Sequence, residues 1–283
     1  MNKTIISIHA HPDDESSKGA AIIARYVSEG ARAVLITATG GEEGDIINPA
    51  MKTDYVRANL AMIRSQELDE AVKIIGYHRL VKLGYRDSGM VGTPANENPS
   101  CFAMVPIDEA ASVVARVIRQ ERPSVMLTYP EIQSRYPHPD HVRVYHLSMR
   151  AMELASDPAF EPQGDAPHEI EKVYYHIWTK ERILAIHEKF IELGLESPFT
   201  SGWFEDAIQD YLATTKIALK GFSQIRRDAL LAHRTQIDPN SPFWFGLDVD
   251  DELDAYPTED LYLARGPVGY EFVGIEDDLF GGL

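Results

Sequence analysis

The chain has 283 residues, 44% of them hydrophobic, and its 44 acidic and 27 basic side chains give a net charge of −17. A surface this acidic repels phosphate backbones and anionic lipids, so we expect neither nucleic acid nor a membrane as a partner. Cys101 is the single cysteine, which excludes an intrachain disulfide, and no apolar run is long enough for a membrane span or a signal peptide, so we expect a cytoplasmic protein.

Strand-like and helix-like segments alternate along the first two thirds of the chain. Short β-branched and apolar runs predict the strands, and apolar residues at helical spacing predict the helices. In chain order these are strand 4–8, helix 19–28, strand 33–37, helix 54–75, strand 79–83, helix 107–121, strand 124–129, helix 139–155 and strand 172–178. This alternation is typical of βαβ units and predicts an α/β fold with a Rossmann-like, mostly parallel sheet flanked by helices.

After residue 180 the pattern changes to helices, which we expect at 181–193, 206–219 and 223–233. No Gly/Ser-rich or Pro-rich linker separates this part from the rest, and the chain is short for two domains. We therefore expect one domain over residues 1–283, with an α/β core at 1–180 and a helical C-terminal layer at 181–283.

Two short motifs rich in His and Asp follow predicted strands. His11-Pro-Asp-Asp-Glu15 comes directly after the first strand, and Pro137-His-Pro-Asp-His141 lies between the fourth strand and its helix. Because the carboxyl ends of parallel strands share one edge of a sheet, both loops lie on the edge where such sheets bind ligands. The two motifs meet if the first and fourth strands are neighbours.

Each motif alone has an ordinary structural explanation. Acidic residues are favoured at helix starts, and a histidine on a loop is usually a solvated side chain. Together they favour a metal site, because three adjacent carboxylates repel one another unless a cation lies among them. Imidazole and carboxylate are zinc ligands, and three protein ligands with an open fourth position is the pattern of catalytic zinc.

The side-chain geometry of the motifs indicates which residues bind the metal. Asp13 and Asp14 are adjacent, so their side chains diverge, and Asp14 is better placed to join His11 and His141 as a ligand. Asp13 is then left free beside the metal and its bound water. His138 can face the same cleft without binding the ion, and Asp140 can orient a neighbouring imidazole.

The two motifs resemble those of the LmbE-like zinc hydrolases, the family of the GlcNAc-PI de-N-acetylases. The resemblance extends along nearly the whole chain and is strongest to the mycothiol branch of the family, through stretches 14–20, 39–51, 84–90, 232–239 and 276–280. It implies a zinc hydrolase that cleaves the cysteinyl–glucosamine amide of mycothiol S-conjugates, a detoxification reaction. The alternative within the branch is deacetylation of GlcNAc-inositol or a related N-acetyl amino sugar.

A third hypothesis, from another class, is a non-catalytic zinc-binding or sugar-binding protein with the same fold. The intact Asp13 argues against it, because a binding module needs no base beside its metal. Iron(II) is an alternative to zinc, since two imidazoles and one carboxylate accept either ion.

The resemblance also implies catalytic roles for four residues. Asp13 is the general base, and His138 stabilises or protonates the tetrahedral intermediate, with Asp140 holding His138. Tyr136 contacts the oxyanion.

Four further residues match positions expected to bind the substrate: Lys18, Asp45, Arg64 and Asp87. Lys18 fits the S-conjugate branch better than the deacetylases. Asp87 has the alternative role of starting the Asp-Ser-Gly turn, and Arg64 that of pairing with Glu67 along its own helix. His233, in the stretch 232–239, receives no role from the sequence.

Overall fold

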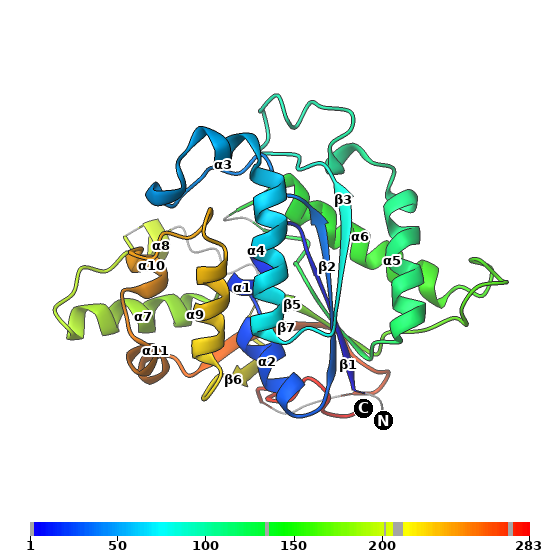
Figure 1. Ribbon diagram of the computed structural model, residues 1–283. Helices are drawn as coiled ribbons and strands as arrows, with labels where there is room; N and C mark the ends of the chain where they lie inside the picture. The colour runs from blue at the N-terminus through cyan, green and yellow to red at the C-terminus, as the bar shows by residue number, and fades with distance from the viewer. Residues whose placement is uncertain (1–2, 134–135, 201, 206–211, 271–273) are drawn as a thin grey trace.

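A computed structural model describes residues 3–133, 136–200, 202–205, 212–270 and 274–283. Its centre is one twisted seven-stranded sheet with helices on both faces (Figure 1). The strand order is β3-β2-β1-β4-β5-β7-β6. The strands are β1 Thr4–His9, β2 Arg32–Thr39, β3 Arg79–Tyr85, β4 Val125–Thr128, β5 Lys172–His176, β6 Thr215–Ala218 and β7 Thr258–Arg265.

The first five strands are parallel, β7 pairs antiparallel with β5, and β6 pairs antiparallel with β7 at the edge of the sheet. The prediction of a mostly parallel α/β sheet is therefore confirmed. Alternate residues of β1 enter opposite cores: Ile5 packs with one cluster of apolar side chains, and Ile6 and Ile8 with the other. Burial on both faces is why these strands are apolar almost throughout.

Each face of the sheet has its own helices. The core of Ile5 includes α2 (Ala20–Ser28), α4 (Leu60–Ile75) and α9 (Ser223–Ala232). The core of Ile6 includes α5 (Ile107–Glu121) and α6 (Pro139–Ser156). Both layers are visible on either side of the sheet in Figure 1.

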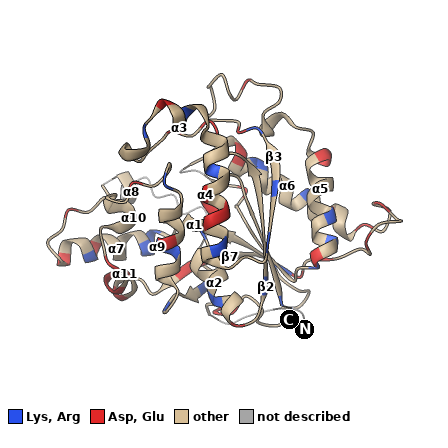
Figure 2. Ribbon diagram, in the orientation of Figure 1, with Lys and Arg blue, Asp and Glu red and all other residues tan. Residues whose placement is uncertain are grey.

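The remaining helices are short or lie at the periphery. They are α1 Asp14–Ser17, α3 Asp54–Ala58, α7 Lys180–Glu192, α8 Gly202–Glu205, α10 Pro242–Phe245 and α11 Val249–Ala255, with 3₁₀ turns at Pro49–Met51 and Phe102–Met104. Acidic side chains gather in the first turn of α11 at the outer edge of the molecule (Figure 2). No helix in the described ranges is both long and apolar enough to cross a membrane.

The predicted helix 54–75 is divided in two by Asn59. The side chain of Asn59 donates a hydrogen bond to the Tyr55 carbonyl oxygen, an acceptor in the last turn of α3. Asparagine competes in this way with helical backbone bonds. The chain therefore turns between α3 and α4, although the apolar spacing continues through the break.

The predicted helical C-terminal layer also contains two strands. The predicted helices 181–193 and 223–233 are present as α7 and α9. The predicted helix 206–219 is wrong at its end, because Thr215–Ala218 is strand β6. Residues 206–211 lie outside the described part of the chain. Strand β7 was not predicted. Four residues are too few to show a strand period, and β6 forms by pairing with β7 across a long separation in sequence. Because these strands complete the sheet of the core, we propose that residues 1–283 form one domain.

The strand order decides where the two motifs lie. β1 pairs with β2 on one side and with β4 on the other, so chain connections leave β1 in opposite directions. The loops after β1 and β4 therefore start side by side at the carboxyl edge of the sheet, which is where such folds bind ligands.

Candidate functional site

The two motif loops bring His11, Asp14 and His141 together. Asp14 Oδ2 lies 3.4 Å from His11 Nδ1 and 3.5 Å from His141 Nε2. All three side chains are buried, and their ligand atoms lie within 4.8 Å of one another. Two imidazole nitrogens and a carboxylate oxygen converging at these separations have the chemistry and the spacing of a divalent metal site.

A second group of potential ligands, His11, His138 and Asp140, lies within the same distance. One side-chain atom of each residue is already in a polar contact, whereas Asp140 Oδ1 has no hydrogen-bond partner among the described residues. Asp140 Oδ2 lies 3.2 Å from His11 Nε2 and accepts the Ser88 N–H at 2.9 Å, while His138 Nδ1 accepts the Asp140 N–H at 3.2 Å. These contacts orient His11 and leave its Nδ1 toward Asp14, so the first group fits a metal better.

Lys18 lies against the carboxylate of this group. Its Nζ is 2.7 Å from Asp14 Oδ1, the oxygen that does not face the imidazoles. Burial opposes ionisation of Asp14, but Lys18 and His141 outweigh it and hold the pKa of this carboxyl well below its usual range. Asp14 is thus ionised, as a metal ligand must be.

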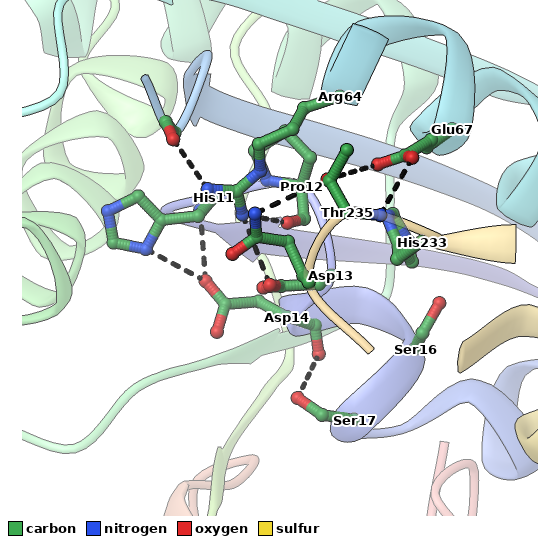
Figure 3. A network of polar contacts seen from close by, with 12 residues as sticks. His11, Pro12, Asp13, Asp14, Ser16, Ser17, Arg64, Glu67, His233 and Thr235 are labelled. Atoms are coloured by element: carbon green, nitrogen blue, oxygen red, sulfur yellow. Dashed lines mark hydrogen bonds and ion pairs between the residues drawn. The ribbon is translucent and has the colours of Figure 1, made fainter. Parts of the chain in front are cut away.

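Asp13 has the most unusual backbone in the site. Its φ is 113° and ψ −25°, in the left-handed region that non-glycine residues rarely adopt. Arg64, from α4, donates to Asp13 Oδ2 at 3.1 Å and to the carbonyl oxygens of Pro12 and Gly41 (Figure 3). Burial raises the pKa of the Asp13 carboxyl, and the charge of Arg64 opposes this rise.

His138 and Tyr136 lie over the imidazoles. The His138 ring packs edge-on against His11 with ring centres 4.6 Å apart, and the Tyr136 ring lies 5.5 Å from that of His141. Burial, followed by the neighbouring charges of His11 and His141, lowers the pKa of His138 to about 4. Tyr136 is 55% exposed, so its ring forms part of the open side of the site.

Asp140 and Asp87 both face His11. The resemblance implied that Asp140 holds His138, but its carboxylate contacts His11, and only its backbone N–H reaches His138. Asp87 Oδ1 lies 3.7 Å from His11 Nε2 and also accepts the Gly89 N–H, as the turn explanation predicted. Burial would raise the pKa of Asp87, yet its contact with His11 and this N–H hold it below its usual range.

The other residues expected to bind substrate differ in exposure. Lys18 keeps part of its side chain exposed beside the triad, and Asp45 is exposed on the loop after β2. Arg64 is 3% exposed, and its donors reach atoms of Pro12, Asp13 and Gly41 rather than Glu67.

Several residues of the site were missed by sequence reasoning. Tyr129, directly after β4, stacks on the His141 ring with centres 4.5 Å apart, and the Ser88 backbone helps to hold Asp140. Glu15 and His233 form a buried pair, with 2.6 Å between Glu15 Oε1 and His233 Nε2. The clustering of Glu15 with two aspartates was the available signal, and the sequence analysis connected it to a metal ion and not to His233.

The comparison with known proteins agrees with the motifs. The sequence profile of the GlcNAc-PI de-N-acetylase family (PIG-L) matches residues 6–152, which include both motifs. The chain belongs to this family. It is 40% identical to the mycothiol S-conjugate amidase of Streptomyces coelicolor, over 99% of this chain and 97% of that protein.

A second curated relative supports the same class, and a solved structure supports the fold. The chain is 37% identical to the 1D-myo-inositol 2-acetamido-2-deoxy-alpha-D-glucopyranoside deacetylase of Geodermatophilus obscurus, over 100% of this chain and 98% of that protein. The N,N'-diacetylchitobiose deacetylase of Pyrococcus horikoshii has the same fold, with a TM-score of 0.64 at 16% identity over 93% of this chain and 84% of that one. The expectation of an amidase or deacetylase is therefore confirmed at this level.

Proposed function

We propose that this chain is a zinc-dependent amidase that hydrolyses the cysteinyl–glucosamine amide of mycothiol S-conjugates. The proposal rests on where the stretches that resemble the mycothiol branch lie in the fold. Four of these stretches carry residues that contact the site. In 14–20, Lys18 contacts Asp14, and in 39–51, Gly41 contacts Arg64. In 84–90, Asp87 contacts His11, and in 232–239, His233 contacts Glu15. Two of these segments contact the triad itself and two contact its neighbours Arg64 and Glu15, and the S. coelicolor amidase is similar to nearly the whole chain.

His11, Asp14 and His141 would hold the metal through Nδ1, Oδ2 and Nε2. A bound zinc ion supplies a Lewis acid, which polarises an amide carbonyl and makes water more acidic. Iron(II) accepts the same ligands. Metal analysis of protein purified without added metal distinguishes the two ions, and iron as the main metal would contradict the zinc part of the proposal.

Asp13 is the general base in this proposal. Arg64 binds its Oδ2, so Oδ1 is the oxygen left to take a proton from the water that attacks the amide carbon. The same carboxyl then returns the proton to the departing glucosamine nitrogen. Burial raises the pKa of Asp13, which strengthens it as a base, and the ion pair with Arg64 at 3.1 Å favours its ionised form.

His138 and Tyr136 stabilise the oxyanion that forms at the amide carbonyl. Because His138 Nδ1 accepts the Asp140 N–H, the neutral ring carries its proton on Nε2, and this N–H can donate to the oxyanion. The Tyr136 hydroxyl is a second donor on the open side of the site. Donors of this kind contribute roughly 3 kcal/mol each to the transition state.

The substrate is then a small amino-sugar conjugate, and Lys18, Asp45, Arg64 and Asp87 remain the residues proposed to bind its sugar part. Lys18 can reach the sugar through the exposed part of its side chain beside Asp14, and Asp45 is exposed on the loop after β2. Arg64 and Asp87 are each 3% exposed, so they reach it only at the floor of the site, beside Asp13 and His11.

A competition assay tests the choice of substrate. The zinc-loaded enzyme is given equal concentrations of an S-alkylated mycothiol and GlcNAc-inositol, and the products are identified by mass spectrometry. We expect mainly the N-acetylcysteine S-conjugate and free glucosaminyl-inositol. Preference for the acetyl substrate would establish the deacetylase alternative instead, which the 37% identity to the G. obscurus enzyme favours.

A further inference from the structure

The strained backbone of Asp13 is held by a buried pair of side chains outside the metal triad. The Asp13 N–H donates to Glu15 Oε2 at 3.0 Å. The other oxygen of this carboxylate, Oε1, accepts from His233 Nε2 at 2.6 Å and from the Ser16 hydroxyl. The side chains of Glu15 and His233 are both 0% exposed, so no solvent can replace either partner.

His233 belongs to the C-terminal layer, 220 positions beyond Asp13 in the sequence. It directly follows the last residue of α9, and the segment after it is fixed to α4 by Thr235, whose N–H and hydroxyl donate to the two oxygens of Glu67. Figure 3 shows this segment beside the Asp13 loop. Arg64, one turn before Glu67 on α4, donates a hydrogen bond to the Asp13 carboxylate. Asp13 is therefore held at its backbone N–H by Glu15 and at its side chain by Arg64.

We propose that Glu15 and His233 are positioning residues that hold Asp13 in its left-handed conformation and so aim its carboxylate at the metal triad. This inference rests on the proposed role of Asp13 as the base. A non-glycine residue leaves this region of φ and ψ unless its surroundings enforce it. Glu15 is an effective clamp because its two oxygens accept from different elements: Oε2 from the Asp13 backbone and Oε1 from His233.

The clamp also explains why a carboxylate is needed at residue 15. The two donors reach different oxygens of Glu15, and a glutamine would place an NH2 group, which cannot accept, against either the Asp13 N–H or the His233 Nε2–H. The contact also explains a histidine at residue 233, because its Nε2–H donates a hydrogen bond to Glu15. A leucine would fill the space without donating this hydrogen bond, whereas the terminal amide of a glutamine could still donate it.

The decisive variants are therefore His233→Leu, which loses the donor, and His233→Gln, which keeps one. For His233→Leu we expect kcat per bound metal to fall by about tenfold or more while KM changes less than about twofold, because a misaimed base affects the chemical step. His233→Gln should keep most of the wild-type kcat. Glu15→Gln is a second, nearly isosteric variant with the same expected loss, should His233→Leu fail to fold.

Thr235→Val is the matched control in the same segment. It removes the hydroxyl donated to Glu67 but leaves the Glu15–His233 contact, so it lowers the unfolding temperature without lowering kcat per bound metal. If Thr235→Val and His233→Leu reduce kcat equally, or if His233→Gln is as impaired as His233→Leu, the pair only stabilises the fold and the inference is wrong.

Amide hydrogen exchange provides a readout that needs no substrate. The Asp13 N–H is protected by Glu15, so in metal-loaded His233→Leu or Glu15→Gln it should exchange about tenfold faster or more, and in His233→Gln and Thr235→Val at the wild-type rate. Unchanged exchange in both of the first two variants would overturn the inference. A wild-type protein that cleaves neither substrate would refute the proposed function instead, whatever the exchange rates.

Discussion

Lys18 Nζ lies 2.7 Å from Asp14 Oδ1, while the other oxygen of the same carboxylate faces His11 and His141. One carboxylate thus serves a cationic side chain and the proposed metal ligands at once. The ammonium group supports Asp14 when no metal is bound. When a divalent ion is bound, the same ammonium group repels it.

Replacing Lys18 with methionine should tighten metal binding. The change leaves Asp14 without its partner in the metal-free protein, and it removes a positive charge close to the bound ion, so both effects favour the loaded state. We expect the metal dissociation constant, measured by chelator competition, to fall by about tenfold, since charges at such distances interact by about 1 kcal/mol or more. The metal-free variant should also unfold at a lower temperature. Weaker metal binding would show that Lys18 mainly orients Asp14.

Replacing His141 with alanine should abolish metal binding. The variant leaves two of the three proposed ligands, and catalytic zinc sites require three from the protein. Elemental analysis after dialysis measures the metal directly. His146→Ala is a suitable control, because His146 is an exposed histidine on the same helix, α6, and should keep its full metal content. Full metal content in His141→Ala would refute the triad.

Replacing Asp13 with asparagine should remove turnover but not metal. The amide keeps the shape of the side chain and an oxygen for Arg64 but cannot accept a proton, so kcat should fall by about 10²–10⁴-fold. Asp54→Asn is the control, because Asp54 is an exposed acidic residue at a helix start without a role in the site. Loss of metal from Asp13→Asn would mean that Asp13, and not only Asp14, is a ligand.

The local sequence was sufficient to predict the sheet edge and the three residues of the triad. The alternation of strands and helices gave the parallel core, and motifs after β1 and β4 are adjacent wherever those two strands pair. The proximity of His11, Asp14 and His141 follows from these two facts, since Asp14 lies three residues after His11 and His141 lies in the first turn of α6.

The features that were not predicted depend on pairing between distant parts of the chain. β6 and β7 form because they pair with each other, and β7 also pairs with β5 at the edge of the sheet. The local sequence does not indicate how many strands the sheet contains. In the same way, nothing in the neighbourhood of His233 indicates that its partner is Glu15, and an arginine on an amphipathic helix does not reveal that it binds Asp13. These contacts depend on the tertiary packing of α4 and α9.

The last prediction concerns a partly buried carboxylate far from the triad, Glu121 at the end of α5. Arg32 Nε and Arg79 Nη1, from β2 and β3, each lie 2.7 Å from one of its oxygens. These two arginines, with Arg32 the stronger influence, hold the pKa of Glu121 below its usual value of 4.5. A carboxyl whose pKa is lower in the folded state stabilises the fold at every pH above its unfolded pKa, and the contribution disappears as the pH falls toward the folded value.

Glu121→Gln should therefore lower the free energy of unfolding by about 1–2 kcal/mol at pH 7, less than is usual for hydrogen bonds to a charged group because solvent screens the partly exposed arginines. The difference from the wild type should shrink steadily as the pH falls below about 4.5, because the wild-type carboxyl is then protonated in the unfolded state and gains less from remaining ionised when folded. Urea unfolding at pH 7, 5 and 4 measures both quantities, with the exposed Glu97→Gln as a control that should follow the wild type throughout. A difference that is independent of pH would mean that Glu121 stabilises the junction of β2, β3 and α5 by its shape and neutral hydrogen bonds, and that its charge contributes nothing.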